Sequence, residues 1–182
     1  RWMDKKSTAM DLFLFGSLFI MALYHIGLFA VRKKDVSPLY FFFFFVLVAG
    51  RILLTGEKIF TQAFPEIPWE TQIKAEYITF FLSIPSFFLF LRSLFPAEFH
   101  RFALYASLFF GLIFTFPVFF LDAHITSRAV LVYQFILVAA CLYVAFVLVY
   151  AAVKKREGSF VFLAGAGIMI PTVIHDVLAT NL

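Results

Sequence analysis

Six long apolar runs constrain what this chain can fold into. A bilayer core of ~30 Å is crossed by about 20 helical residues that rise ~1.5 Å each. Each run reaches this length or falls slightly short of it, and the runs span residues 10–31, 38–54, 73–94, 102–121, 129–153 and 160–178. Hydrophobic residues make up 63% of the chain and charged residues only 14%, which excludes an ordinary soluble domain. The sequence therefore predicts an all-α, polytopic bundle of transmembrane helices.

The pattern inside the runs excludes a transmembrane β-barrel. Barrel strands alternate between apolar and polar residues over about ten positions, whereas residues 41–50 read FFFFFVLVAG. The junctions between runs are short except the second, so consecutive helices are expected to be antiparallel neighbours. We take residues 1–9 as an extracytoplasmic juxtamembrane segment and residues 10–182 as the bundle.

Basic residues between the runs indicate how the bundle is oriented. The N-terminal segment and the even-numbered junctions hold six of them, and the odd-numbered junctions hold eight, Arg32, Lys33, Lys34, Arg92, Arg101, Lys154, Lys155 and Arg156. Because basic residues favour the cytoplasmic side, we expect the odd junctions in the cytoplasm and the N-terminus outside. The clusters at 32–34 and 154–156 are expected to contact anionic lipid headgroups or a cytoplasmic domain.

Arg51 is the clearest ionisable residue at membrane depth. Inserting such a group costs about 2.5–3.5 kcal/mol, so it requires a partner or a role. Glu76 lies one turn into the next run at the same level, and an Arg51–Glu76 ion pair between adjacent helices is expected, with Glu57 as the competing partner. Two interpretations stay open. One is an ion pair that sets the register of the helices, and the other is anion binding by Arg51 in an outward-facing pocket.

Further ionisable residues are predicted at the same level of the membrane. Asp11 opens the first run, and His175 and Asp176 close the sixth. Taken singly, each is explained by solvation at the membrane interface. Together they would ring the outward mouth of the bundle, and the predicted ligand or signalling pocket consists of Asp11, Arg51, Glu76, His175 and Asp176.

The sequence lacks the usual patterns of catalytic residues. No HExxH or HxxxH spacing occurs, and the four histidines, His25, His100, His124 and His175, fall at different depths or on opposite sides. No set of metal ligands is therefore predicted. Glycine-rich phosphate loops and a nucleophile elbow are also missing. We expect no catalytic residue, no cofactor and no nucleic-acid partner, and we expect His25 to hydrogen-bond to a neighbouring helix.

Several segments together resemble the transmembrane region of bacterial seven-transmembrane receptors with diverse intracellular signalling modules. In order, they read GSLFIMALYHIGLFAVRKKDVSPLYF (16–41), GRILLTGEKIF (50–60), FPEIPWETQIKAEYITFFL (64–82), LFPAEFH (94–100) and IHDVL (174–178). The resemblance implies a sensory domain outside the membrane before the first span and a cytoplasmic output module after a seventh span. It therefore implies that this chain holds six spans of an expected seven. It implies no ligand and no binding residues.

The sequence and the resemblance together predict a sensor domain of a bacterial signalling protein in the inner membrane. It would relay an extracytoplasmic stimulus to an output module of the same parent chain, with the lipid bilayer and a second copy as further partners. No enzymatic activity is expected of the bundle itself. Two alternatives come from other classes, a membrane-embedded metal-dependent hydrolase and a small transporter or channel. Against the transporter, no internal repeat is visible.

Overall fold

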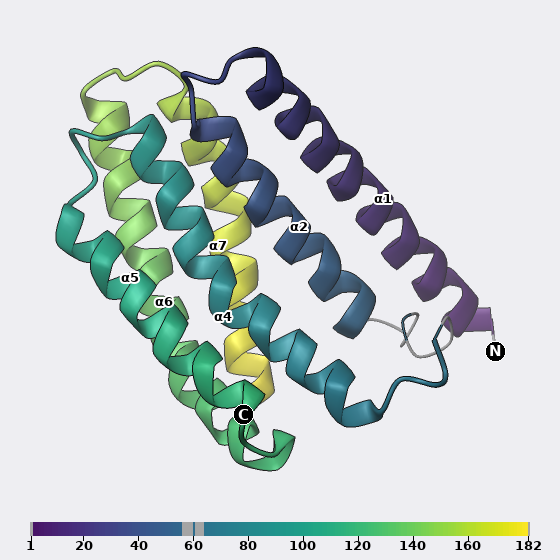
Figure 1. The fold of residues 1–182 in the computed structure, drawn as a ribbon. Coiled ribbons are helices and arrows are strands. Elements are labelled where there is room, and N and C mark those ends of the chain that lie inside the picture. The colour runs from purple at the N-terminus through teal and green to yellow at the C-terminus, as the bar shows by residue number, and fades with distance from the viewer. Residues whose placement is uncertain (1, 56–59, 61–63, 182) are drawn as a thin grey trace.

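The predicted all-α bundle is confirmed by a computed structural model, which describes residues 2–55, 60 and 64–181 and, among these, all side chains except those of 2–7, 176 and 178–181. The helices follow the six apolar runs (Figure 1). They are α1 (Trp2–Val31), α2 (Ser37–Thr55), α4 (Trp69–Leu94), α5 (Arg101–Thr115) with the short 3-10 helix η1 (Phe116–Phe119), α6 (Ala123–Val153) and α7 (Ser159–Asn181).

Five of the helices are long and apolar enough to cross a membrane. They are Thr8–Val31 of α1, α2, α4, α5 together with η1, and α6. The described apolar part of α7, Ser159–His175, is shorter. The chain is thus a multi-pass membrane protein. Its helices satisfy most of their backbone hydrogen bonds internally, as the bilayer core demands.

Successive helices run in opposite directions (Figure 1), and each packs mainly on the next along the chain, except that α5 and α6 make little contact. The main contacts of α1 are with α2, those of α2 extend to α4, and α4 also packs on α5 and α6. α7 packs chiefly on α6. We call the end of the bundle at which α1, α4 and α6 begin the N-terminal face. The opposite face holds the loops 32–36, 95–100 and 154–158.

The best-buried part of the bundle lies between α4 and α6. Phe81 and Leu91 of α4 and Tyr133 and Leu148 of α6 are almost completely buried. The rings of Phe81 and Tyr133 meet edge to face, with centroids 4.8 Å apart. In a membrane, helices associate through such close packing and through hydrogen bonds, because lipid is as apolar as the side chains.

Pro85 inside α4 explains the hydrogen bond at the centre of this core. A proline has no backbone N–H, so it leaves the carbonyl four residues earlier, that of Phe81, without its helical donor. The buried hydroxyl of Tyr133 donates to that carbonyl at 2.6 Å. A side chain of α6 thus replaces the backbone donor that α4 lacks, and the two helices are held in one register.

Gly111 allows α5 to approach the same point from the other side. A Cβ atom at this position would lie 2.5 Å from Cγ of Pro85 and 3.2 Å from the carbonyl oxygen of Phe81. No side chain fits there without a shift of α5. The helix also changes its geometry near Pro117, since α5 ends at Thr115 and the chain continues as the 3-10 helix η1.

We expect Tyr133→Phe to destabilise the protein by about 1–2 kcal/mol, because it leaves the buried carbonyl of Phe81 without a donor. In a Pro85→Ala background the same change should cost clearly less, because residue 85 then has an N–H of its own. Unfolding of the four proteins in mixed micelles measures both costs. Tyr105→Phe, at an exposed position of α5, is the matched control, and equal costs in the two backgrounds would contradict the assignment.

Candidate functional site

The structure brings Arg51 of α2 and Glu76 of α4 together within the membrane-spanning part of the bundle. Nη2 of Arg51 lies 4.0 Å from Oε1 of Glu76, at the outer limit of an ion pair and beyond hydrogen-bond length. The two side chains are 36% and 22% exposed. Cζ of Arg51 also lies 4.7 Å from the centroid of the Phe80 ring, a cation–π contact. Glu57, the competing partner, lies outside the described residues.

Aromatic and polar contacts join α2 to α4 along their length. Nearer the opposite face, Phe41 stacks on Phe90 with centroids 4.1 Å apart, and the rings of Phe44 and Phe87 are 4.9 Å apart. Near the N-terminal face, the amide of Gln72 donates to the carbonyl of Leu54 at 3.3 Å. The α1–α2 hairpin is therefore attached to the bundle chiefly through one helix, α4.

The remaining members of the predicted pocket lie on other helices. Asp11 is partly buried on α1, at the edge of the bundle, and α2 lies between α1 and α4 (Figure 1). His175 is exposed on α7, which packs chiefly on α6. The side chain of Asp176 lies outside the described part of the chain. Of the predicted five, the structure joins Arg51 and Glu76, and a common pocket of all five stays a prediction.

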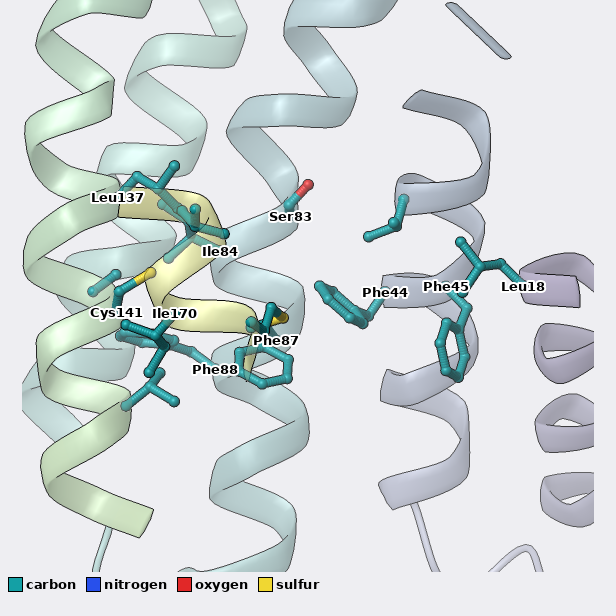
Figure 2. A pocket seen from close by; sticks show the side chains of 15 residues that line it. Leu18, Phe44, Phe45, Ser83, Ile84, Phe87, Phe88, Leu137, Cys141 and Ile170 are labelled. Atoms are coloured by element: carbon teal, nitrogen blue, oxygen red, sulfur yellow. The ribbon is translucent and has the colours of Figure 1, made fainter. Parts of the chain in front are cut away.

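An apolar cleft, which the sequence did not indicate, lies between five helices. Figure 2 shows Phe44 of α2 extending toward the space that Phe87 of α4 borders from the other side. The cleft has a volume of about 450 Å³. Its lining is apolar apart from Ser83 and the thiol of Cys141, and consists of Leu18, Phe44, Phe45, Val48, Ser83, Ile84, Phe87, Phe88, Leu137, Ala140, Cys141, Val144, Met169, Ile170 and Val173. We call it the apolar cleft.

A second cavity lies beside Arg51. Its volume is about 280 Å³, and Arg51 and Gln134 are its polar lining residues. The rest of its lining is apolar, from Phe80, Val130, Leu137, Val173 and Val177. We call it the Arg51 cavity. It is a space near the N-terminal face in which Arg51 can present a positive charge.

An ion pair with a buried carboxylate lies at the opposite face. Nε of Arg156 donates to Oε1 of Glu98 at 2.7 Å, and the Glu98 side chain is only 1% exposed. The pair joins the α4–α5 loop to the α6–α7 loop. Lys155 has φ of 53°, in the left-handed region that is unusual for a residue other than glycine. This turn directs the chain back toward Glu98.

Sequence reasoning missed the role of Glu98. The signal for it is an acidic residue between Phe95 and Phe99, both nearly buried, in a protein whose loops on this face are mainly basic. From the sequence alone, residues 95–100 look like an exposed polar loop. Burial of Glu98 could be expected only if Phe95 and Phe99 were assumed to pack back on the bundle.

Most of the predicted basic contacts at the opposite face are free to meet an external partner. Arg32, Lys33, Lys34, Lys154 and Lys155 are exposed, as contact with headgroups or with a cytoplasmic domain requires. Nζ of Lys154 also lies 4.4 Å from the centroid of the Tyr150 ring. Arg156 differs, since its partner is Glu98 of the same chain. External contacts of these residues stay a prediction.

His25 makes a different contact from the expected one. Its Nδ1 hydrogen-bonds to the carbonyl of Met21 at 2.7 Å, within α1 and not between helices. Its contact with α2 is ring packing, with centroids 4.6 Å from Phe41 and 5.8 Å from Phe45. His25 therefore contributes to the packing of α1 against α2.

Comparisons with known proteins place the chain among membrane signalling domains. A family model described as 7TM diverse intracellular signalling matches residues 7–182. Comparisons with curated proteins and with solved structures gave no significant match. Over the described residues, no group of three or more histidine, cysteine, aspartate or glutamate side chains is placed to hold a metal ion.

The Glu98–Arg156 pair should respond unequally to loss of its two members. Arg156→Ala leaves a buried carboxylate without its cation and should cost about 2–4 kcal/mol of folding free energy. Glu98→Gln keeps an acceptor for the half-exposed Arg156 and should cost less, and adding it to Arg156→Ala should recover part of the loss. Unfolding in mixed micelles gives these values, with Lys34→Ala as the exposed control. Equal costs for both single variants would show that burial of the carboxylate is not the cause.

Proposed function

The chain belongs to the 7TM diverse intracellular signalling family, and from that premise we propose that it is a sensor domain that relays an extracytoplasmic stimulus to a cytoplasmic output module. Membership makes it a membrane signalling domain. We further propose that the N-terminus lies outside the bacterial inner membrane, so that the N-terminal face receives the stimulus. The eight basic residues of the odd junctions support this orientation.

The observation that supports a relay most directly is the long Arg51–Glu76 contact between α2 and α4. At 4.0 Å, it holds the two helices less tightly than a hydrogen-bonded pair would. A signalling domain needs an element with two arrangements of similar free energy, which a stimulus can bias. An ion pair at the membrane level, between a peripheral hairpin and the core, meets that need.

The α1–α2 hairpin is the element that we expect to move. Its buried hydrophobic residues among those described are Ala22, Ala49 and Leu54, whereas α4 and α6 supply most of the large buried side chains. The apolar cleft lies on the inner side of α2, between it and the α6–α7 pair. Space on that side gives α2 room to shift against α4.

Movement of the hairpin would reach the opposite face directly. The α1–α2 loop holds Arg32, Lys33 and Lys34, and a tilt of two rigid helices about α4 displaces that loop. The α4–α5 and α6–α7 loops, tied together by Glu98 and Arg156, would form the fixed reference beside it. An output module in contact with both parts would sense their relative position.

The proposed relay is tested by reversing the charge of residue 51, near the N-terminal face, and recording the signal of a probe at position 33, at the opposite face. A trifluoromethyl probe is placed at Lys33→Cys in a Cys141→Ala background, and its fluorine NMR spectrum is recorded in nanodiscs. Arg51→Glu should change the ratio of two resonances by about fivefold or more, because it replaces attraction to Glu76 by repulsion. The swap Arg51→Glu/Glu76→Arg should restore the ratio, since it restores an ion pair.

Arg128→Glu is the matched control, because it reverses an exposed charge near the same face on α6. It should leave the resonances of the probe at position 33 unchanged. Arg51→Gln serves where charge reversal impairs folding, which circular dichroism detects. A probe spectrum that is identical in all folded variants would overturn the proposed relay.

A further inference from the structure

The Arg51 cavity and the apolar cleft are neighbours, because Leu137 of α6 and Val173 of α7 line both of them. The Arg51 cavity, with Arg51 and Gln134, lies toward the N-terminal face, and the apolar cleft lies nearer the middle of the bundle. Together they offer one charged end and one apolar end.

The two cavities together have about the length of a lipid chain. Gln134, which lines the Arg51 cavity, and Val144, which lines the apolar cleft, are ten residues apart on α6, or about 15 Å at ~1.5 Å per residue. One leaflet supplies about half of the ~30 Å hydrocarbon core, so a lipid chain reaches about as far. The apolar cleft alone, at about 450 Å³, also falls among the volumes of small-molecule sites, roughly 300–1,000 Å³.

The positive charge of Arg51 favours a ligand with a negatively charged head group. A guanidinium has five N–H donors and binds carboxylates well. The contact with Glu76, at 4.0 Å, engages none of these donors at hydrogen-bond length. Arg51 can therefore hold a second oxyanion while Glu76 remains its neighbour, and the low dielectric strengthens that contact.

We propose that these two neighbouring cavities together form a binding site for a single-chain anionic amphiphile, a long-chain carboxylate whose head contacts Arg51 and whose chain fills the apolar cleft. One chain fits the apolar cleft, whereas the second chain of a phospholipid would have to lie outside it. This proposal adds a class of ligand to the proposed function. It rests on that function only in the expectation that ligand binding at Arg51 affects signalling. Binding is measurable by itself.

Palmitate and hexadecanol are the two probes, since they differ in the charge of the head. Each is titrated into the purified protein in nanodiscs of zwitterionic phosphatidylcholine, and bound ligand is counted by native mass spectrometry. We expect palmitate to bind once per chain and at least about tenfold more tightly than hexadecanol, because a charge-assisted hydrogen bond separates them. Arg51→Gln should remove that preference, and Arg128→Gln should not.

The chain end is tested by filling the cleft. Ala140 lines the cleft, and the neighbouring Ala139 is exposed on the outer surface of α6. Ala140→Phe should reduce palmitate binding by about tenfold or more, because the new ring occupies the apolar cleft. Ala139→Phe should bind palmitate like the parent protein. Both variants are checked for folding by circular dichroism, and Ala140→Leu serves if the larger residue impairs it.

Four results would overturn the proposal. Two are equal binding of palmitate and hexadecanol and unchanged binding in Arg51→Gln. The third is displacement of palmitate by phosphatidylglycerol at equal mole fraction, which would make the site one for ordinary anionic lipid. The fourth is absence of palmitate binding. If palmitate binds as expected but the probe at position 33 never responds to residue 51, the relay fails and the binding site stands.

Discussion

The bundle depends on a hydrogen bond that one proline makes necessary. Pro85 removes a backbone donor from the middle of α4, and the carbonyl of Phe81 would be left unsatisfied at a depth where no water can reach it. The hydroxyl of Tyr133 supplies the donor, and Gly111 lets α5 pack on the same point. Three helices are thereby held in one mutual position, and α6 in turn positions α7. Both the apolar cleft and the Arg51 cavity are lined in part by α4 and α6.

The two sites at the ends of the bundle differ because their ion pairs differ. At the opposite face, the Glu98–Arg156 pair has hydrogen-bond length and a buried carboxylate, so it ties two loops of the core together. Near the N-terminal face, Arg51 and Glu76 are 4.0 Å apart and partly exposed, and they join the core to the α1–α2 hairpin. The proposed relay requires one tight contact within the core and one weaker contact between the core and the hairpin, with space beside the weaker one. The two ion pairs and the apolar cleft meet these requirements.

Much of the fold follows from the sequence, because bilayer thickness and backbone satisfaction leave few choices for runs of this length and polarity. The pairing of Arg51 with Glu76 was also within reach, since depth in the membrane places both residues at one level on consecutive helices. The roles of Tyr133, Gly111 and Glu98 were not, because each depends on which helices are neighbours and on how closely they approach. The same limit applies to the predicted five-residue pocket, in which Asp11 and His175 lie on helices at different sides of α2. The apolar cleft is a property of packing and leaves no pattern in the sequence.

In the proposed relay, α4, α5 and α6 form a fixed core against which the α1–α2 hairpin moves. Spin labels at exposed positions test it by pulsed electron resonance in nanodiscs. Labels at Phe102 and Val153, on α5 and α6, report on the core, and labels at Val31 and Val153 report on the hairpin relative to it. A fixed core and a moving hairpin should give one narrow distance distribution for the first pair and a broad or two-peaked distribution for the second. Equally narrow distributions for both pairs would contradict it.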